Sequence, residues 1–202
     1  MLTRNRSLWF MWILLGCTNT QASIEFRKAH KGDLPGLFQV DREVTDEYFK
    51  PLYRNAYSHL CIGQDPDFYL DKELKEDIAW FEECISLESN YSLYVAVDGI
   101  TQDVAGLIIS HKEDKTTLLI DLLLVCKKYR NKGIGKELVR STIGVFKDVQ
   151  TCVVYPFGCS ENQTTLNFYR SVGFKDLGPA DVDKEAYGIP YIDLYRYLRL
   201  DL

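Results

Sequence analysis

One short segment has the residue types and spacing of a loop that binds a phosphate group. It reads Arg130, Asn131, Lys132, Gly133, Ile134, Gly135 and Lys136. Its two glycines leave the backbone free of Cβ atoms, so a ligand can approach it closely. An apolar run at residues 118–125 precedes the segment, and an amphipathic pattern follows it at residues 138–146. A helix that begins there would direct unpaired N–H groups and the positive end of its dipole at an anion.

Two familiar phosphate loops do not fit this segment. The dinucleotide fingerprint needs a third glycine three residues after the second, where this chain has Leu138. The P-loop needs Gly-Lys-Ser/Thr after a four-residue gap, and the chain lacks that sequence here. The segment therefore indicates a different kind of phosphate-bearing ligand.

The segment resembles the acyl-coenzyme A loop of the GNAT superfamily of N-acetyltransferases, whose pattern is Arg/Gln-x-x-Gly-x-Gly/Ala. A second group of residues matches the family's later motif, Asn-x6-Tyr-x3-Gly-Phe. Its members are Asn162, Tyr169, Gly173 and Phe174. Thr165 stands where the family usually has Ala, and Lys127 where Pro is common, but neither change removes a group that the reaction needs. The resemblance covers residues 24–200.

This resemblance implies that acetyl-coenzyme A is the acyl donor. The residues expected to bind it are Leu123, Val125, Arg130, Asn131, Lys132, Gly133, Ile134, Gly135, Lys136 and Asn162. Arg130 and Lys136 would supply positive charge to the pyrophosphate, and the loop amides would supply hydrogen bonds. The backbone of Leu123 and Val125 would pair with the pantetheine amides. No metal is expected.

The resemblance also implies that a primary amine is the acceptor and that Tyr169 protonates the leaving sulfur. The base is open from the sequence. Asp121, in the apolar run before the loop, is a candidate to relay the proton of the acceptor, because a carboxylate there needs an explanation. Alternatively, Asp121 faces outward or pairs with a nearby Lys or Arg. Glu161 is a weaker candidate.

A second function stays open beside acetyl transfer, namely a non-catalytic acyl-coenzyme A binding or sensor protein tethered to a membrane. A lipoprotein with an incidental likeness to the fold is a third. Acidic and aromatic residues crowd residues 45–69, which we expect to be irregular. This stretch would wall the acceptor side and favour a cationic amine, unless it is a plain solvated loop.

Composition predicts one globular domain. The chain has 202 residues, which is long enough to bury a core. Its shares of apolar and charged residues, 46% and 26%, are those of an ordinary globular protein. The net charge of −5 argues against nucleic acid as the principal partner, because phosphate backbones are bound by clustered Lys and Arg.

The first 22 residues have the pattern of a targeting segment. Arg4 and Arg6 precede an apolar run at residues 8–17, which is too short to span a bilayer but suits a secretory signal. The run ends in Leu-Leu-Gly-Cys at Cys17, similar to a bacterial lipobox that would give a membrane tether. Because acetyl-coenzyme A is made and kept in the cytosol, three explanations stay open: an uncleaved anchor, export into a compartment that supplies the thioester, or a wrongly chosen start codon of a cytoplasmic protein. Either way, residues 23–202 are expected to form the single acetyltransferase domain.

The cysteines show no metal-type or paired spacing. Setting Cys17 aside, five remain, an odd number that leans toward the cytosol. Cys126 and Cys152 lie in apolar runs and are expected to be small core residues. With only three His in the chain, a zinc site is not expected.

The elements that must position these groups follow from periodicity. Strands are expected at residues 24–29, 91–97, 104–110, 116–125, 151–155 and 191–200, with helices at 71–88 and 162–172 and one capped by Asp33. In the helix at 71–88, Leu74, Ile78, Phe81 and Ile85 would form the buried stripe. Asp98-Gly99 suits the positive φ angles of a turn.

This order predicts an α/β fold. Its core would be a mixed, mostly antiparallel central sheet of about seven strands with helices on both faces. The resemblance implies that the fourth and fifth strands splay apart to admit the pantetheine arm.

Overall fold

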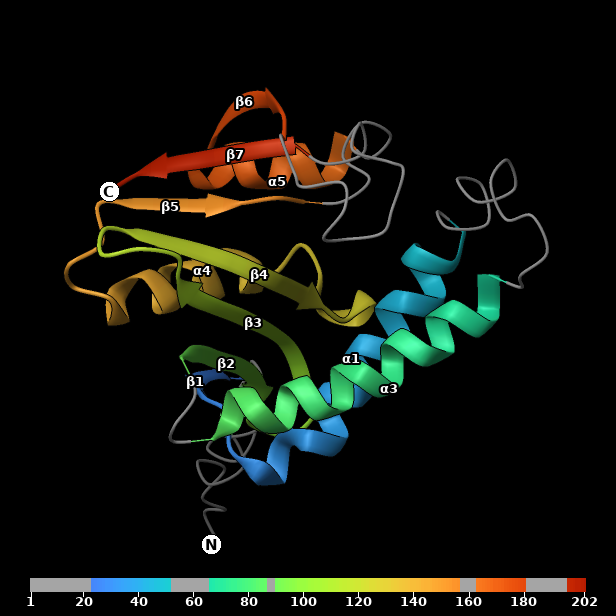
Figure 1. The fold of residues 1–202 in the computed structure, drawn as a ribbon. Coiled ribbons are helices and arrows are strands. Elements are labelled where there is room, and N and C mark those ends of the chain that lie inside the picture. Colours follow the sequence, from blue (N-terminus) through green and yellow to red (C-terminus); the bar gives the residue numbers. More distant parts are fainter. Residues whose placement is uncertain (1–22, 52–65, 87–89, 157–162, 181–195) are drawn as a thin grey trace, which may run out of the picture.

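The computed structural model of the chain describes residues 23–51, 66–86, 90–156, 163–180 and 196–202. A seven-stranded sheet runs through this part in the order β1-β2-β3-β4-β5-β7-β6 (Figure 1). Neighbouring strands are antiparallel except β4 and β5, which are parallel. The strands are β1 (Ile24–Lys28), β2 (Tyr91–Asp98), β3 (Val104–Lys112), β4 (Thr117–Val125), β5 (Thr151–Val154), β6 (Lys175–Pro179) and β7 (Arg196–Asp201). The predicted mixed, mostly antiparallel sheet is confirmed.

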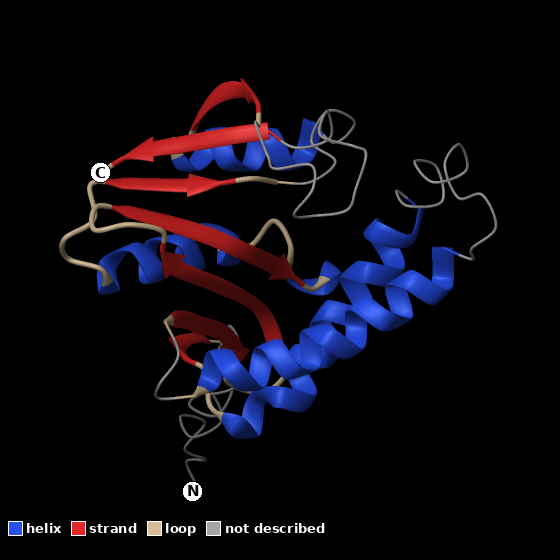
Figure 2. Cartoon of the chain, in the orientation of Figure 1, coloured by secondary structure: helices blue, strands red, loops and turns tan. Residues whose placement is uncertain are grey.

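Helices cover both faces of the sheet, as predicted. Helices α1 and α3 lie on one face, whereas α4 and α5 lie on the other (Figures 1 and 2). The helical elements are η1 (Lys31–Asp33), α1 (Leu34–Val44), the π-helical turn η2 (Thr45–Phe49), α3 (Pro66–Ile85), η3 (Lys127–Tyr129), α4 (Ile134–Val145) and α5 (Gln163–Val172). Among the helices of the described ranges, none is both long and apolar enough to cross a bilayer.

The predicted amphipathic helix after the loop is α4, which packs on the sheet. Leu138, Val139 and Thr142 are fully buried on its inner face. The Thr142 hydroxyl lies 3.2 Å from the hydroxyl of Ser110 on β3, so this buried polar pair is satisfied. Ser110 therefore faces α4, and its neighbour His111 faces the opposite side of the sheet, which α1 and α3 cover.

Strands β4 and β5 part halfway along β4. Their pairing runs only from Thr117 opposite Thr151 to Ile120 opposite Val154. On the other edge of β4, the register with β3 skips Asp121, because Ile109 pairs with Leu122 while Ser110 pairs with Ile120. Asp121 is thus the extra residue of a β-bulge, which bends a strand and strengthens its twist. Figure 1 shows the two strands diverging beyond this point, so the predicted splay is confirmed.

The buried cysteines behave as core residues. Cys126 and Cys152 are buried, as predicted, and so is Cys84 of α3. Burial raises the pKa of the Cys126 thiol to about 11 and those of Cys84 and Cys152 to about 12. These thiols stay protonated at neutral pH and are poor nucleophiles.

The predicted helix at residues 71–88 is displaced toward the N-terminus. Helix α3 begins at Pro66, where the missing N–H of proline is harmless, and ends at Ile85. Phe81 is fully buried, as expected, but Ile78 is 39% exposed and does not belong to the buried stripe. Cys84 takes part in the buried face instead, so the face is rotated relative to the predicted one. Leu74 lies outside the side chains that the structure describes.

The stretch at residues 45–69 is not irregular throughout. Its beginning is the π-helical turn η2, which continues α1, and its end is the first turn of α3. Residues 52–65 lie outside the described part.

One local prediction was right only in part, and another was wrong. Asp33 occupies the N-cap position of α1, as predicted, but its carboxylate makes no hydrogen bond to that helix. It accepts two from the guanidinium of Arg27, at 2.7 and 2.8 Å, and one from the His30 N–H at 2.8 Å. In the turn after β2, the positive φ of 62° belongs to Gln102 and not to Gly99. Gly99 is required for another reason, since a Cβ there would lie 2.8 Å from the carbonyl oxygen of Ser23.

The last predicted strand is found in part. Strand β7 begins at Arg196, and residues 191–195 lie outside the described part. Leu198 is fully buried.

Candidate functional site

The glycine-containing segment forms the turn between β4 and α4, where the sequence predicts a phosphate loop. Asn131 and Gly133 have positive φ angles of 61° and 81°, which reverse the chain before α4 begins at Ile134. No side chain caps this helix, and its first hydrogen bond runs from the Glu137 N–H to the Gly133 carbonyl. The N–H groups of the first turn are therefore available to an anion.

The two glycines of this loop have different surroundings. A Cβ placed at Gly133 would meet nothing within 4 Å, so the space before this residue is open. A Cβ at Gly135 would lie 3.0 Å from the ring of Phe168 on α5. Gly135 thus allows α5 to approach the first turn of α4, and the open approach belongs to Gly133.

The basic side chains of the loop are partly engaged within the protein. The Nε atom of Arg130 donates a 2.9 Å hydrogen bond to the Val125 carbonyl, and its guanidinium lies 3.1 Å from the carboxylate of Glu47 on η2. The ammonium of Lys132 lies 5.2 Å from the ring centre of Tyr129, a cation–π distance. Arg130 is therefore held beside the loop by internal partners, which the sequence alone did not indicate.

The open edge of β4 presents backbone groups to the gap between β4 and β5. The N–H of Cys126 donates to Ala105 on β3 at 3.0 Å. Because alternate residues of a strand direct their backbone groups to opposite edges, Leu123 and Val125 direct theirs toward the open edge. The Val125 carbonyl already accepts from Arg130, whereas β5 has no ladder partner for Leu123 among the described residues.

Tyr169 lies on α5 and is only 5% exposed. Its ring meets Phe168 and Phe174 edge-on, with ring centres 5.0 and 5.3 Å apart. After α5 the chain turns at Gly173, whose φ of 110° suits glycine, and the Phe174 N–H donates to the Tyr169 carbonyl at 3.1 Å. The spacing of the later motif thus packs Phe174 against Tyr169 and fixes the tyrosine ring. Asn162 and Glu161 lie outside the described residues.

Asp121 is paired, but with a partner that the sequence did not suggest. Its Oδ2 lies 2.7 Å from Nδ1 of His111 on β3. Although the residue as a whole is exposed, the Asp121 side chain is only 18% exposed, so its exposed surface is mainly backbone at the open edge. Burial raises the pKa of the Asp121 carboxyl, against the lowering effect of the hydrogen bond to His111.

Aromatic side chains continue from this pair toward α3. The His111 ring meets Tyr91 of β2 edge-on at 5.1 Å, and Tyr91 meets Trp80 of α3 at 5.8 Å. His111 was missed in the sequence because its contact with Asp121 joins two different strands. The available signal was the short connection between the strands at 104–110 and 116–125, which indicates a hairpin and brings His111 opposite Leu119.

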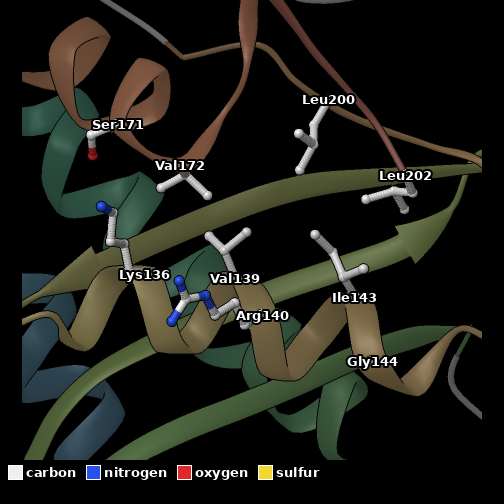
Figure 3. A pocket seen from close by; sticks show the side chains of 9 residues that line it. All are labelled: Lys136, Val139, Arg140, Ile143, Gly144, Ser171, Val172, Leu200 and Leu202. Atoms are coloured by element: carbon white, nitrogen blue, oxygen red, sulfur yellow. The ribbon is translucent and has the colours of Figure 1, made fainter.

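A hollow of about 340 Å³ lies on the face of the sheet that α4 and α5 cover (Figure 3). Lys136 and Arg140 stand one turn apart on its rim, and Val139, Ile143 and Leu200 contribute to its apolar lining. Since His111 faces the other side of the sheet, this hollow is separate from the pair of His111 and Asp121. Of the loop residues 130–136, only Lys136 lines this hollow.

Comparisons with known proteins agree with this geometry. Residues 89–176 match the family model for the GNAT acetyltransferase domain. The peptidyl-lysine N-acetyltransferase YjaB of Escherichia coli (strain K12) is 28% identical over 102 residues, which cover 50% of this chain and 62% of that protein. The chain thus matches less than two thirds of the length of this relative.

Solved structures show the same fold. The PaiA N-acetyltransferase of Thermoplasma acidophilum, in complex with coenzyme A, superposes with a TM-score of 0.63 at 20% identity, covering 89% of this chain and 99% of that one. A GNAT-family acetyltransferase of Staphylococcus aureus Mu50 gives a TM-score of 0.62 at 19% identity with the same coverage.

Proposed function

We propose that this chain, whose residues 89–176 match the GNAT acetyltransferase domain model and whose fold is that of GNAT-family structures, transfers an acetyl group from acetyl-coenzyme A to a primary amine. One observation carries the proposal: β4 and β5 part at the Asp121 bulge, and the loop at the far end of β4 has uncapped helix amides. A thioester can enter such a gap with its phosphates on the loop and its acyl group near the bulge.

The donor is held mainly by backbone. The amides of residues 131–136 and the charge of Lys136 bind the pyrophosphate, and Gly133 leaves room for it. The open edge of β4 at Leu123 pairs with the pantetheine amides. Arg130 contributes only if the phosphate draws its guanidinium away from Glu47. The solved relative from Thermoplasma acidophilum was crystallised with coenzyme A, which supports this choice of donor.

The acceptor is a primary amine that is protonated in water. The YjaB relative is named a peptidyl-lysine N-acetyltransferase, and a lysine side chain is such an amine. An ammonium group must lose a proton before its nitrogen can attack the thioester carbonyl. The carboxylate of Asp121 at the bulge gives this side of the gap a group that attracts a cation.

Tyr169 is the acid that protonates the leaving thiolate. Its ring is fixed between Phe168 and Phe174, so its hydroxyl is held in one direction without a cost in side-chain entropy at the moment of reaction. The resemblance assigns Asn162, the first residue of the same motif, to contact the cofactor through its side-chain amide.

The test is a screen of the full chain with acetyl-coenzyme A and amines of three classes: lysine peptides, polyamines and amino sugars. Release of free coenzyme A thiol together with an acetylated product in the mass spectrum is the expected result. Coenzyme A binding without any acetylated product would indicate a non-catalytic binding protein. Absence of binding in calorimetry would overturn the proposal as a whole.

A further inference from the structure

His111 and Asp121 form a hydrogen-bonded pair at the point where the sheet opens. Nδ1 of His111 and Oδ2 of Asp121 are 2.7 Å apart, and the two side chains are 25% and 18% exposed. In the register, His111 pairs with Leu119, so Asp121 is its diagonal neighbour on the same face of the sheet. The bulge at Asp121 is also where β4 leaves β5.

The pair stands among acidic and aromatic groups. Tyr91 faces His111 from β2, and the ring edges are in contact. Helix α3 contributes Cys84 and Glu83. Cys84 is close enough to Asp121, and Glu83 is close enough to Tyr91, for an electrostatic interaction. Glu113, in the turn after β3, acts on Asp121 as a like charge. No Lys or Arg of the described ranges forms a salt bridge with Asp121, so this surface favours a cationic amine.

The hydrogen bond assigns different roles to the two side chains. A carboxylate can only accept a hydrogen bond, so Nδ1 of a neutral His111 must carry the proton and Nε2 must carry the lone pair. Nε2 of this tautomer is an unprotonated nitrogen that can take up a proton, whereas Oδ2 of Asp121 already accepts the hydrogen bond from Nδ1. Sequence reasoning proposed Asp121 as the base; the geometry favours its partner.

We propose that His111 takes the proton of the acceptor ammonium through Nε2, directly or through one water, and that Asp121 is the positioning residue that holds Nδ1–H. This inference rests on the proposed acetyltransferase function. His111 would also help to set the class of acceptor. A base beside the carboxylate of Asp121 suits an amine that reaches the site as an ammonium cation.

The ammonium gives one proton to Nε2 of His111, and the neutral nitrogen forms a bond to the thioester carbon. The carbon–sulfur bond then breaks, and the sulfur takes the proton of the Tyr169 hydroxyl. The second proton of the nitrogen returns to the Tyr169 oxygen, and the imidazolium of His111 releases its proton to solvent.

The experiment compares pH profiles of kcat/KM for the wild type, His111→Gln and Asp121→Asn with the best amine of the screen. The wild type is expected to show an ascending limb that reports the deprotonation of the base. His111→Gln is expected to lose about 10²- to 10⁴-fold at neutral pH and to lose that limb. Asp121→Asn is expected to lower kcat while the limb remains, because the imidazole is still present but is no longer held in one tautomer. His30→Gln, which removes an imidazole that is 63% exposed near β1, is the matched control.

The results separate this inference from the function on which it rests. Coenzyme A affinity, measured by calorimetry, is expected to stay unchanged in His111→Gln and so verifies that this variant folds. If it does not fold, the Asp121→Asn profile and the NMR titration of His111 in the wild type decide the matter, and an NMR pKa that differs from the kinetic limb overturns the inference. A folded His111→Gln that keeps both the limb and most of the rate overturns it too. A wild type without any acetylated product overturns the proposed function and this inference together.

Discussion

The guanidinium of Arg130 lies 3.1 Å from the carboxylate of Glu47, which joins the loop before α4 to the π-helical turn after α1. Lys127 reaches the same carboxylate at 2.9 Å. The hydrogen bond from Lys127, followed by the charge of Arg130, holds the pKa of Glu47 below its ordinary value. Glu47 is therefore ionised at neutral pH, and in the proposed function it would compete with the phosphate of the donor for Arg130.

Replacing Glu47 with Gln is expected to tighten coenzyme A binding by about two- to fivefold at low salt, since exposed ion pairs contribute roughly 1 kcal/mol or less. The gain comes from freeing Arg130 and Lys127 for the phosphates, and it shrinks as salt screens these charges. Calorimetry at two salt concentrations measures it. Glu25→Gln, which breaks a 3.7 Å ion pair with Arg27 on β1, is the control. Weaker binding in Glu47→Gln would mean that Glu47 serves to hold the loop in place.

Gly133 and Gly178 provide a matched pair of substitutions. Both have positive φ angles, 81° and 111°, and an added Cβ meets nothing within 4 Å at either position. Valine at either position is strained by about 1–2 kcal/mol, so both variants are expected to lose similar stability. Only Gly133→Val is expected to lose coenzyme A affinity, by about 100-fold or more, because it blocks hydrogen bonds between amides and a charged phosphate. Equal affinity of the two variants would contradict the assignment of the loop.

Much of the fold could be predicted because its signals are local. The apolar run of β4, the glycine turn and the stripe of Leu138 and Val139 on α4 each depend on spacing within a few residues. Phe81 was placed correctly by the same reasoning, but Ile78 was not. Periodicity predicts that α3 has a buried face. Which residues lie on that face depends on how the helix is rotated about its axis, and the elements that it packs against decide this rotation.

The candidate site was predictable only in part. The loop and Tyr169 lie in contiguous motifs, so the sequence places them on their elements. The partner of Asp121 is ten residues away along the chain, across a hairpin whose register shifts by one residue at the bulge. The register decides which residues of the two strands lie opposite each other, and no residue type in the sequence reveals it. The ion pair between Arg130 and Glu47 is hidden for a similar reason, because it joins separate elements.

Removing the hydroxyl of Tyr169 tests its role as an acid. Tyr169→Phe keeps the ring between Phe168 and Phe174, so the packing and the coenzyme A affinity are expected to be preserved. Turnover is expected to fall by about 10- to 10⁴-fold, the usual range for acid catalysis. Steady-state kinetics and calorimetry measure the two effects, and Tyr94→Phe on β2 is a control outside the site. Unchanged turnover would remove Tyr169 from the mechanism.

A pair of carboxyl groups joins α1 to α3 away from this chemistry. Asp41 on α1 is only 5% exposed and shares a hydrogen bond with Asp77 on α3. Burial raises the pKa of Asp77 to about 6, more than the hydrogen bond lowers it. One of the two groups must carry a proton for this hydrogen bond to form, because two carboxylates can only accept.

The pH dependence of stability follows from the sign of this shift. The folded pKa of Asp77 lies above its unfolded value near 3.9. The contribution of protonated Asp77 to the stability of the fold is therefore complete below about pH 4, and it is lost as the pH rises toward about 6. In Asp77→Asn the amide donates to Asp41 at every pH, so this variant is expected to gain about 1–2 kcal/mol relative to the wild type between pH 4 and 7. Urea unfolding at several pH values measures the difference, with Asp148→Asn, whose side chain is 87% exposed, as the control. Parallel curves for the wild type and Asp77→Asn would show that no proton is shared across this helix contact.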